Sequence, residues 1–547
     1  MVRKKRVESF YARLRESVKA SSFSSLLIFP STSDVDSLCT LKIIFHILES
    51  DSVRYSCYPV SSFQQIREYV GSDLSSSSEP VIILLINWGC HRDLQKDLKL
   101  GPGVRVFVVD SHRPIHLHNL SEQNDQVVVI YTNDDERLAD LAHDFEVMEL
   151  ANASYCLHNS ELDSEEDEDS ESEDEDEANG DEEEGGSRDG SSKRRRMSSE
   201  GEEEPAARRF KKFRRDYYRM GTFHGKPSGC LMLTDERYEA GVMELQQHIN
   251  SLGNLDVVTS VTLKDGTKVR APDSSRIAYE EEPRLMLLRE WNLFDSMLCS
   301  SMGFALVDCQ QKFQYMNYEV KQKMKDQFEQ ILPEYGLNDF YYKSFLRHHG
   351  YTSRVSAADM VYGVTALLES FVQSDGFCAL KQFGMAYDAL SLSNLDKLKA
   401  GMEQAIKIQR AILRQGSAAI TKSGCIRSGR KFRWVKVEDS VDTKLLGHPQ
   451  ALTKFCYFLM DALKEKGARL KPLLCACMSE EATKVLIVAV CGKPCLGALQ
   501  GNAFGLAFRN AAEETGAEYF HELFESSWIV LDAGAINSFM VRLTEKL

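Results

Sequence analysis

The sequence predicts a multidomain α/β protein whose N-terminal part is a doubly wound parallel sheet. Three short apolar runs carry this prediction: residues 26–29, 81–86 and 104–109. Each run is rich in Leu, Ile, Val or Phe and ends in a polar loop, as expected of a strand buried on both faces. Helical patterns alternate with these runs, which favours repeated β-α-β units. At 547 residues the chain is too long for one core, so three or four domains are expected.

Residues 1–150 are expected to form the first α/β domain. Asp34 or Asp36 is suited to cap the helix that starts at Val35, because short polar side chains accept hydrogen bonds from free helical N–H groups. Further strands are predicted from β-branched and aromatic content, at 53–58 and 127–131. Helices are predicted where apolar residues recur at helical spacing, at 35–48, 63–70, 91–98 and 134–150.

Residues 161–204 hold 22 acidic and 5 basic residues, a local net charge of −17. The whole chain has a net charge of −16, so this segment carries the excess acidity. Such a segment repels itself and cannot bury a core, so 151–204 is predicted to be an acidic, disordered insertion. Its serines lie beside acids, which suits an acidophilic kinase; a spacer without a role is the alternative. The rest of the chain is nearly neutral, so any contact with DNA is expected to be local or weak.

Two basic clusters interrupt or follow the insertion. The cluster at 208–215 (RRFKKFRR) mixes cations with Phe210 and Phe213 and is either a nucleic-acid contact or the charged start of a helix. Residues 205–234 are expected to return to the first domain. Four consecutive cations form a candidate nuclear-import signal, which predicts a location in the nucleus: Lys193, Arg194, Arg195 and Arg196.

Residues 235–414 show helical patterns and are predicted to form an all-α interdomain module. The expected helices lie at 238–252, 283–299, 310–332, 357–371 and 393–413. Residues 415–547 alternate strands with helices again, which predicts a second, smaller α/β domain. Its expected strands are 432–437, 473–477, 485–490 and 528–531, and its helices are 450–465 and 503–515.

Cations flank the aromatic residues of the strand at 432–437. Such an arrangement can pair with phosphates while bases stack on the rings, which makes it a candidate site for single-stranded DNA. An ordinary solvated edge strand is the alternative. The candidate residues are Arg427, Arg430, Lys431 and Arg433.

The remaining composition excludes several protein classes. No run of 18 apolar residues occurs, and no apolar signal-peptide core follows the basic N-terminus, so neither a membrane span nor secretion is expected. The 14 cysteines are scattered without a CxxC pair, which indicates reduced thiols in a cytosolic or nuclear protein. No P-loop motif is present, so ATP hydrolysis by this chain is not expected.

Polar residues follow the three strongest predicted strands and should meet at one edge of the sheet. Carboxylates gathered there outline a two-metal phosphoesterase site, although three carboxylates are few for two divalent cations. The alternative is structural: the first two acids cap a helix, and the last acid and the histidine hydrogen-bond within their loop. The converging residues are Asp34, Asp36, Asn87, Asp110 and His112.

The segments SDVDSL, NWG and DSHRP resemble three motifs of the DHH phosphoesterase superfamily, which includes the RecJ exonucleases. Thr32, Asn87 and Ser111 stand where that superfamily carries two acids and a histidine, and Ser37 replaces a glycine. This eroded pattern, together with the acidic insertion, resembles the cell division cycle forty-five family, catalytically silent RecJ relatives that act in DNA replication. The resemblance implies a DHH-like first domain and a DHHA1-like last domain, although the GGGH pattern of the latter is not recognisable at 501–505.

The resemblance further implies a non-enzymatic subunit of the CMG replicative helicase with no cofactor and no metal. Its partners would be the MCM hexamer, the GINS tetramer, DNA polymerase and other replisome proteins, with weak binding to single-stranded DNA and none to membranes. The chain departs from the family after Met232 and after Ser301, where segments look skipped through splicing or in the gene model.

Two other functions stay open on the sequence. The first is a manganese-dependent DHH-type phosphoesterase or exonuclease with a reduced ligand set. It is disfavoured because an active site should have acids at positions 32 and 87 and a histidine at 111. The second is an acidic histone or nucleosome binder that acts through residues 161–204.

Overall fold

The computed structural model describes residues 7–20, 26–70, 80–120, 124–131, 223–232, 260–262, 268–270, 277–286, 291, 310, 312–313, 316–335, 340–349, 353–369, 376–391, 393–438, 440–479, 483–492, 504–521 and 527–547. The predictions made for 134–150, 151–204, 208–215 and 238–252 lie outside these residues, and so does the candidate import signal.

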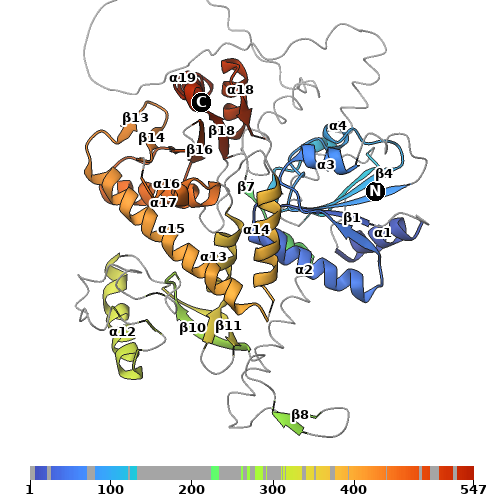
Figure 1. Ribbon diagram of the computed structural model, residues 1–547, viewed down its shortest axis with the longest axis horizontal. Coiled ribbons are helices and arrows are strands. Elements are labelled where there is room, and N and C mark those ends of the chain that lie inside the picture. The colour runs from blue at the N-terminus through green and yellow to red at the C-terminus, as the bar shows by residue number, and fades with distance from the viewer. Residues whose placement is uncertain are drawn as a thin grey trace, which may run out of the picture.

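A five-stranded sheet, parallel throughout, forms the N-terminal part of the protein, as predicted (Figure 1). The strand order is β2-β1-β3-β4-β6. Alternate side chains of each strand point to opposite faces. Both faces are covered by buried apolar side chains, which makes the sheet doubly wound. Its strands are β1 (Leu26–Pro30), β2 (Tyr55–Cys57), β3 (Val81–Ile86), β4 (Val104–Val109) and β6 (Val127–Val129).

Helices from different parts of this region cover the two faces. One face packs against α1 (Val7–Ala20) and α2 (Val35–Ser50). The other packs against α3 (Phe63–Val70), α4 (Leu94–Asp97) and α5 (Leu117–Leu120). The helix predicted at 91–98 is reduced to the single turn of α4. Asp93 caps that turn at its start, and Lys99 follows it with φ of 50°, outside the helical region.

The segment before Met232 returns to the first sheet region. Strand β7 (Phe223–His224) pairs antiparallel with β5 (His112–Arg113). The single turn α8 (Ser228–Leu231) packs beside α2, and the side chains of Leu231 and Met232 are buried in the core that α2 shares with the sheet.

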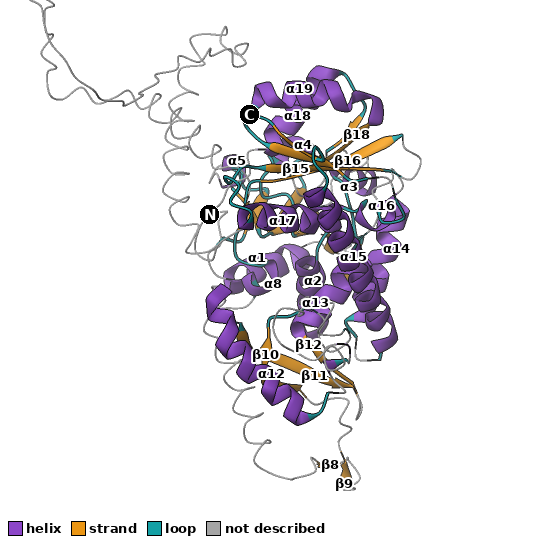
Figure 2. Cartoon of the chain, turned by 90° about the vertical axis from the view of Figure 1, so that its left-hand side faces the viewer, coloured by secondary structure: helices purple, strands orange, loops and turns teal. Residues whose placement is uncertain are grey.

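The prediction that residues 235–414 are entirely helical is wrong. Three strands form an antiparallel sheet there, β10 (Ile277–Pro283), β11 (Tyr341–His349) and β12 (Ser353–Ser356), and β8 (Ser260–Thr262) pairs with β9 (Lys268–Arg270). Residue 283, expected to start a helix, ends β10. The sequence pattern fails because β10 reads IAYEEEP and gains its strand partner from a segment about 60 positions away. Figure 2 shows this sheet beside α12 (Tyr318–Ile331), at one end of the molecule.

The helices of the middle region form its link to both α/β parts. They are α13 (Ala357–Leu368), α14 (Gly376–Ala389) and the long α15 (Leu395–Thr421). The boundary placed at 414/415 falls inside α15. Gly416 weakens an isolated helix, but here a Cβ at Gly416 would collide with the ring of Phe458 on α17 (Pro449–Glu465), so glycine permits the close crossing of α15 and α17.

The C-terminal part is a six-stranded mixed sheet in the order β13-β14-β15-β16-β18-β17. Its strands are β13 (Ile426–Ser428), β14 (Arg433–Lys436), β15 (Leu473–Met478), β16 (Lys484–Val490), β17 (Tyr519–Phe520) and β18 (Trp528–Asp532). Three further helices belong to it: α16 (Thr443–Leu446), α18 (Phe504–Thr515) and α19 (Ile536–Lys546).

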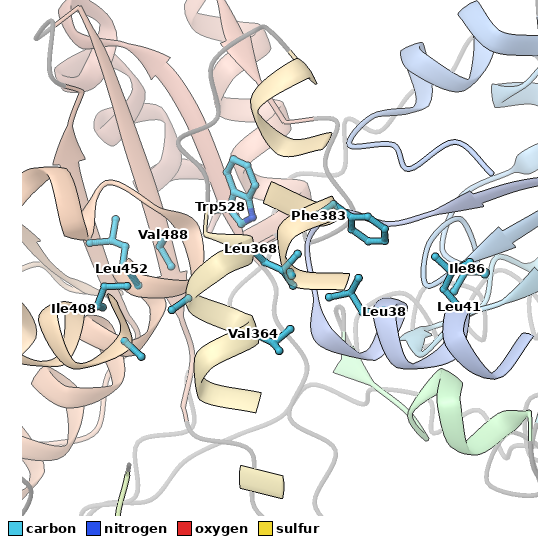
Figure 3. Packing of buried hydrophobic residues seen from close by; sticks show 14 of the residues in the cluster. Leu38, Leu41, Ile86, Val364, Leu368, Phe383, Ile408, Leu452, Val488 and Trp528 are labelled. Atoms are coloured by element: carbon cyan, nitrogen blue, oxygen red, sulfur yellow. The ribbon is translucent and has the colours of Figure 1, made fainter. Parts of the chain in front are cut away.

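One continuous core joins the two α/β parts through the middle helices. Figure 3 shows Leu38 of α2 facing Leu368 of α13 and Phe383 of α14, while Leu452 of α17 and Val488 of β16 lie on the other side of α13. The middle helices therefore hold the two sheets in a fixed relation. In the described part of the chain, no helix combines the length and the apolar character needed to cross a bilayer.

Candidate functional site

The loops that follow β1, β3 and β4 meet at the carboxyl edge of the first sheet. Strand β3 lies between β1 and β4, and the pairs Pro30↔Ile86 and Ile86↔Val109 bring the three strand ends level. Loops that leave neighbouring parallel strands share one crevice. The structure therefore brings Asp34, Asn87 and Asp110 to the same place, although 76 positions separate the first from the last.

Asn87 is the centre of this group. Its Nδ2 donates to Oδ1 of Asp34 at 2.7 Å. Its Oδ1 accepts the backbone N–H and the hydroxyl of Ser111, at 3.1 and 2.6 Å, and the hydroxyl of Ser228 at 2.9 Å. Its φ of 59° lies in the left-handed region that Asn tolerates. An amide is needed here because the side chain both donates and accepts, which a carboxylate cannot do.

Asp34 caps helix α2. Its Oδ1 accepts the backbone N–H of Ser37 at 2.6 Å in addition to the Asn87 amide. Burial raises the pKa of Asp34 to about 6, although the hydrogen bond from Ser37 and the nearby His112 act in the opposite direction. The cap places a charge-bearing group at the positive end of the helix dipole.

Asp36 does not cap α2 but binds the segment that returns to the sheet. Its Oδ2 accepts the backbone N–H of Ser228 at 2.7 Å, and its Oδ1 accepts the backbone N–H of Gly229 at 3.0 Å. Both donors belong to the first turn of α8, whose N–H groups have no partner within the helix. Each oxygen of the Asp36 carboxylate therefore binds backbone that lies far away in the sequence.

Asp110 and His112 form a buried pair. Oδ1 of Asp110 lies 2.6 Å from Nδ1 of His112 and accepts the His112 backbone N–H at 2.9 Å, and Oδ2 accepts the backbone N–H of Cys90 at 2.9 Å. Burial by itself raises the pKa of Asp110, but His112 and these hydrogen bonds outweigh it and hold the pKa well below its usual range. Asp110 is therefore ionised and completely enclosed.

Other histidines surround His112. Its ring centroid lies 6.0 Å from that of His91 and 4.9 Å from that of His224 on β7. Burial, followed by the charges of Arg92 and His112, lowers the pKa of His91 to about 3, so His91 is neutral at physiological pH. The His224 contact comes from β7, so the returning segment packs against His112.

These residues do not fit a pair of divalent cations. A two-metal site needs several carboxylate oxygens directed at the ions. Both oxygens of Asp36 and both of Asp110 accept N–H groups of the protein, and Oδ1 of Asp34 accepts two. The hydroxyl of Ser111 donates to Asn87 instead of offering a ligand. Protein donors take the place where cations would neutralise the carboxylates.

The sequence did not point to several residues that complete this arrangement. Ser228 and Gly229 lie about 190 positions from Asp36, and Cys90 contributes only its backbone. Gln450 of α17 donates its Nε2–H to the backbone carbonyl of Ser33, which brings the C-terminal part against the loop after β1. No local pattern marks such partners, because backbone donors and long-range contacts leave no signature in residue type.

The candidate DNA-binding cations lie elsewhere, on the outer hairpin of the C-terminal sheet. Arg430 and Lys431 are exposed in the turn between β13 and β14, and Arg427 stacks over the ring of Trp434 at 4.8 Å from its centroid. Strand β13 is an edge strand, paired with β14. The site is therefore accessible and distinct from the crevice.

The chain is similar to known proteins over almost its full length. The family model described as CDC45 matches residues 26–234, 231–301 and 300–546. Its pieces meet at the two positions where the sequence looks shortened. The "Cell division control protein 45 homolog" of Schizosaccharomyces pombe is 27% identical over 638 residues, covering 98% of each chain. The homolog of Homo sapiens is 26% identical and covers 94% of this chain and 96% of its own.

A solved structure supports the same fold. The crystal structure of CDC45 from Entamoeba histolytica superposes with a TM-score of 0.63 at 17% identity, covering 99% of this chain and 98% of that one. The two proteins therefore share an architecture at low sequence identity. Together with the family model, which spans nearly the entire sequence, this leads to one conclusion: the chain belongs to the CDC45 family.

Proposed function

We propose that this protein is a non-catalytic factor in the initiation and elongation of DNA replication. In this proposal it acts in the nucleus as a scaffold subunit of the CMG helicase, with the MCM hexamer and the GINS tetramer as direct partners and DNA polymerase and other replisome proteins nearby. Membership of the CDC45 family supports the role in replication. The partners follow from what the family resemblance implies.

The observation that carries the non-catalytic part is that protein N–H groups already bind both oxygens of Asp36 and of Asp110. A cation would therefore have to compete with these hydrogen bonds. These hydrogen bonds suit a scaffold, because they link the loops after β3 and β4 with α2 and α8 without a metal. The runner-up is a manganese-dependent phosphoesterase or exonuclease with a reduced ligand set.

One preparation tests both functions. The purified full chain is incubated with Mn²⁺ and single-stranded DNA, and the same tagged chain is used to capture partners from nuclear extract for mass spectrometry. We expect no turnover, no stoichiometric manganese, and recovery of MCM and GINS subunits. DNA degradation that Asp110→Ala abolishes would establish the phosphoesterase, and failure to recover MCM or GINS would refute the scaffold assignment.

Weak binding to single-stranded DNA belongs to the same proposal. The hairpin of β13 and β14 supports it, since exposed cations lie there beside the ring of Trp434. The chain outside the acidic insertion is nearly neutral, so the binding should be weak and sensitive to salt. A nuclear location is supported by the basic run at 193–196.

A further inference from the structure

A second group of ligand-type side chains lies outside the crevice, where the loop before α4 meets the start of α5. Asp93, His116 and His118 each offer one ligand atom, and the three atoms lie within 4.8 Å of one another. The side chain of Asp93 is 16% exposed and that of His118 is 46% exposed. We propose that these three residues bind a single Zn²⁺ ion, with a fourth position left for water or for a ligand from a partner.

The first support is that Asp93 is held in place. Its Oδ1 caps α4 by accepting the backbone N–H of Lys96 at 3.1 Å, which leaves Oδ2 directed at Nδ1 of His118, 2.6 Å away. One oxygen thus fixes the side chain while the other faces the imidazole. A metal ion entering here takes the place of the proton that the Asp93–His118 pair shares.

The second support is that both loops are fixed to each other by a buried amide. The Nδ2 of Asn119 donates to the carbonyl oxygens of Cys90 and Arg92, at 3.2 and 2.6 Å, and its Oδ1 accepts the backbone N–H of Leu94 at 3.2 Å. The backbone N–H of His116 donates to the same Cys90 carbonyl at 2.6 Å. The ligands therefore stand on a preformed scaffold rather than on two independent loops.

The third support is the chemistry of the donors. Two imidazoles and one carboxylate suit zinc, whereas Mg²⁺ and Ca²⁺ prefer oxygen ligands. Bonds of about 2.0–2.2 Å place the ligand atoms of a tetrahedral zinc site about 3.3–3.6 Å apart. The Asp93–His118 pair, now 2.6 Å apart, has to open to that spacing, and the exposed ring of His118 can do so by side-chain rotation. The ion would stabilise the loop that contains Cys90, whose backbone N–H donates to Asp110.

The alternative is that Asp93 and His118 form only an ion pair that links the two loops. The full chain, stripped with a chelator and then titrated with Zn²⁺ in excess Mg²⁺, separates the two. The Mg²⁺ occupies the acidic residues between 161 and 204, which would otherwise bind cations weakly. Binding is followed by calorimetry and by competition with a chromophoric chelator, and Co²⁺ substitution reports the ligand geometry through its visible absorption.

We expect the wild-type chain to take up one tightly bound equivalent. His46, exposed on α2, provides the matched control, so His46→Gln should bind equally well. His118→Gln and the double variant His116→Gln/His118→Gln should weaken binding by about 100-fold or more, since loss of outer-shell partners alone costs 10–100-fold. Zinc should also raise the unfolding midpoint of the wild type but not that of the double variant.

Equal zinc affinity in the wild type and the double variant would overturn the proposal, and so would a wild type that retains no zinc. Circular dichroism checks that each variant folds. Asp93→Asn provides a second test, because it keeps an acceptor for the Lys96 N–H while removing the negative charge. If Asp93→Asn lowers stability but leaves zinc affinity unchanged, Asp93 is not a ligand and the three-residue site is wrong.

Discussion

The carboxylate of Asp36 accepts the backbone N–H of Ser228 at 2.7 Å across 192 positions of sequence. The neighbouring N–H of Gly229 reaches the other oxygen of the same carboxylate at 3.0 Å. An acid that stands at a metal-ligand position in the resemblance to DHH enzymes is thus used to anchor the segment that returns after the acidic insertion. The first three predictions below test contacts of this site.

Asp36→Asn should loosen α8 and lower the free energy of unfolding. An amide can accept only one of the two N–H groups and turns its own donor toward the other, which costs about 1–3 kcal/mol. Urea unfolding measures the loss, and hydrogen exchange should quicken at Ser228 and Gly229. The control is Asp396→Asn, at an exposed acid in the first turn of α15, which should change stability little. Unchanged exchange at both amides would contradict the anchoring role.

Asn87→Asp should destabilise the protein at neutral pH. It removes the donor to Asp34, which lies 2.7 Å away, and sets two carboxylates against each other. Loss of this charge-assisted bond costs about 2 kcal/mol or more. Much of the stability should return near pH 5, where a shared proton relieves the repulsion. Asn87→Gly, which keeps the φ of 59° without strain, separates the side-chain effect from the backbone effect. An Asn87→Asp variant as stable as the wild type at neutral pH would show that the Asn87 hydrogen bonds do not hold this site together.

Asp110→Ala should lower stability by about 3–5 kcal/mol, because it leaves His112 without its buried partner. Asp34→Ala should also lower stability, through loss of the α2 cap, by about 0.5–2 kcal/mol. Thermal unfolding measures both effects, and partner assembly should weaken only in proportion to the unfolded fraction. A stable, well-folded Asp110→Ala protein that lost DNA or nucleotide binding would show that the crevice still holds a ligand.

His521 should make the protein less stable in mild acid. Its Nδ1 faces the Trp528 carbonyl oxygen at 2.7 Å and its Nε2 faces that of Gly505 at 3.1 Å. These contacts favour the protonated ring, but burial outweighs them and lowers the pKa of His521 to about 4. The unfolded chain takes up this proton near pH 6.5, so protons favour unfolding between about pH 6.5 and pH 4. From pH 7 to pH 5 this group removes about 2 kcal/mol.

The variant His521→Gln isolates that contribution, because it cannot titrate. The pH dependence of its unfolding free energy should be flatter than that of the wild type, while the exposed His46→Gln variant should keep the wild-type slope. Asp34 acts in the opposite direction: its raised pKa of about 6 gives stability at low pH that is lost as the pH rises through 6. Parallel slopes for His521→Gln and the wild type would contradict the assignment to His521.

Charge reversal at Arg430 and Lys431 should weaken binding to single-stranded DNA. The plot of log K against log salt has a negative slope. If each cation neutralises one phosphate, this slope should become shallower by about 1.4 in the double variant. Fluorescence anisotropy at several salt concentrations measures affinity and slope together. The control makes the same charge change at two exposed lysines of α12 and α15, Lys323→Glu and Lys407→Glu. Equal losses in both double variants would mean that net charge, and not the β13–β14 hairpin, governs binding.

The sequence by itself determined the elements whose residues are buried or nearly all buried. Strands β3 and β4 begin and end where their apolar runs do, because a continuous apolar stretch of that length fits a central parallel strand. It also placed Asp34, Asn87 and Asp110 at one edge, since parallel neighbours end on the same side of a sheet. It left open which of Asp34 and Asp36 caps α2, and the structure assigns that cap to Asp34.

Only the tertiary structure decided the contacts that join distant segments. The charged strand β10 is stabilised by pairing with β11, which no periodicity within residues 277–283 reveals. Gly416 lies inside α15 because Phe458 packs against it. The two oxygens of Asp36 accept N–H groups of α8, so this acid anchors distant backbone where a DHH enzyme would use it as a metal ligand. Local sequence fixes periodicity and capping, whereas the partner of a buried polar group depends on which distant segment satisfies it, because burial without a partner is costly.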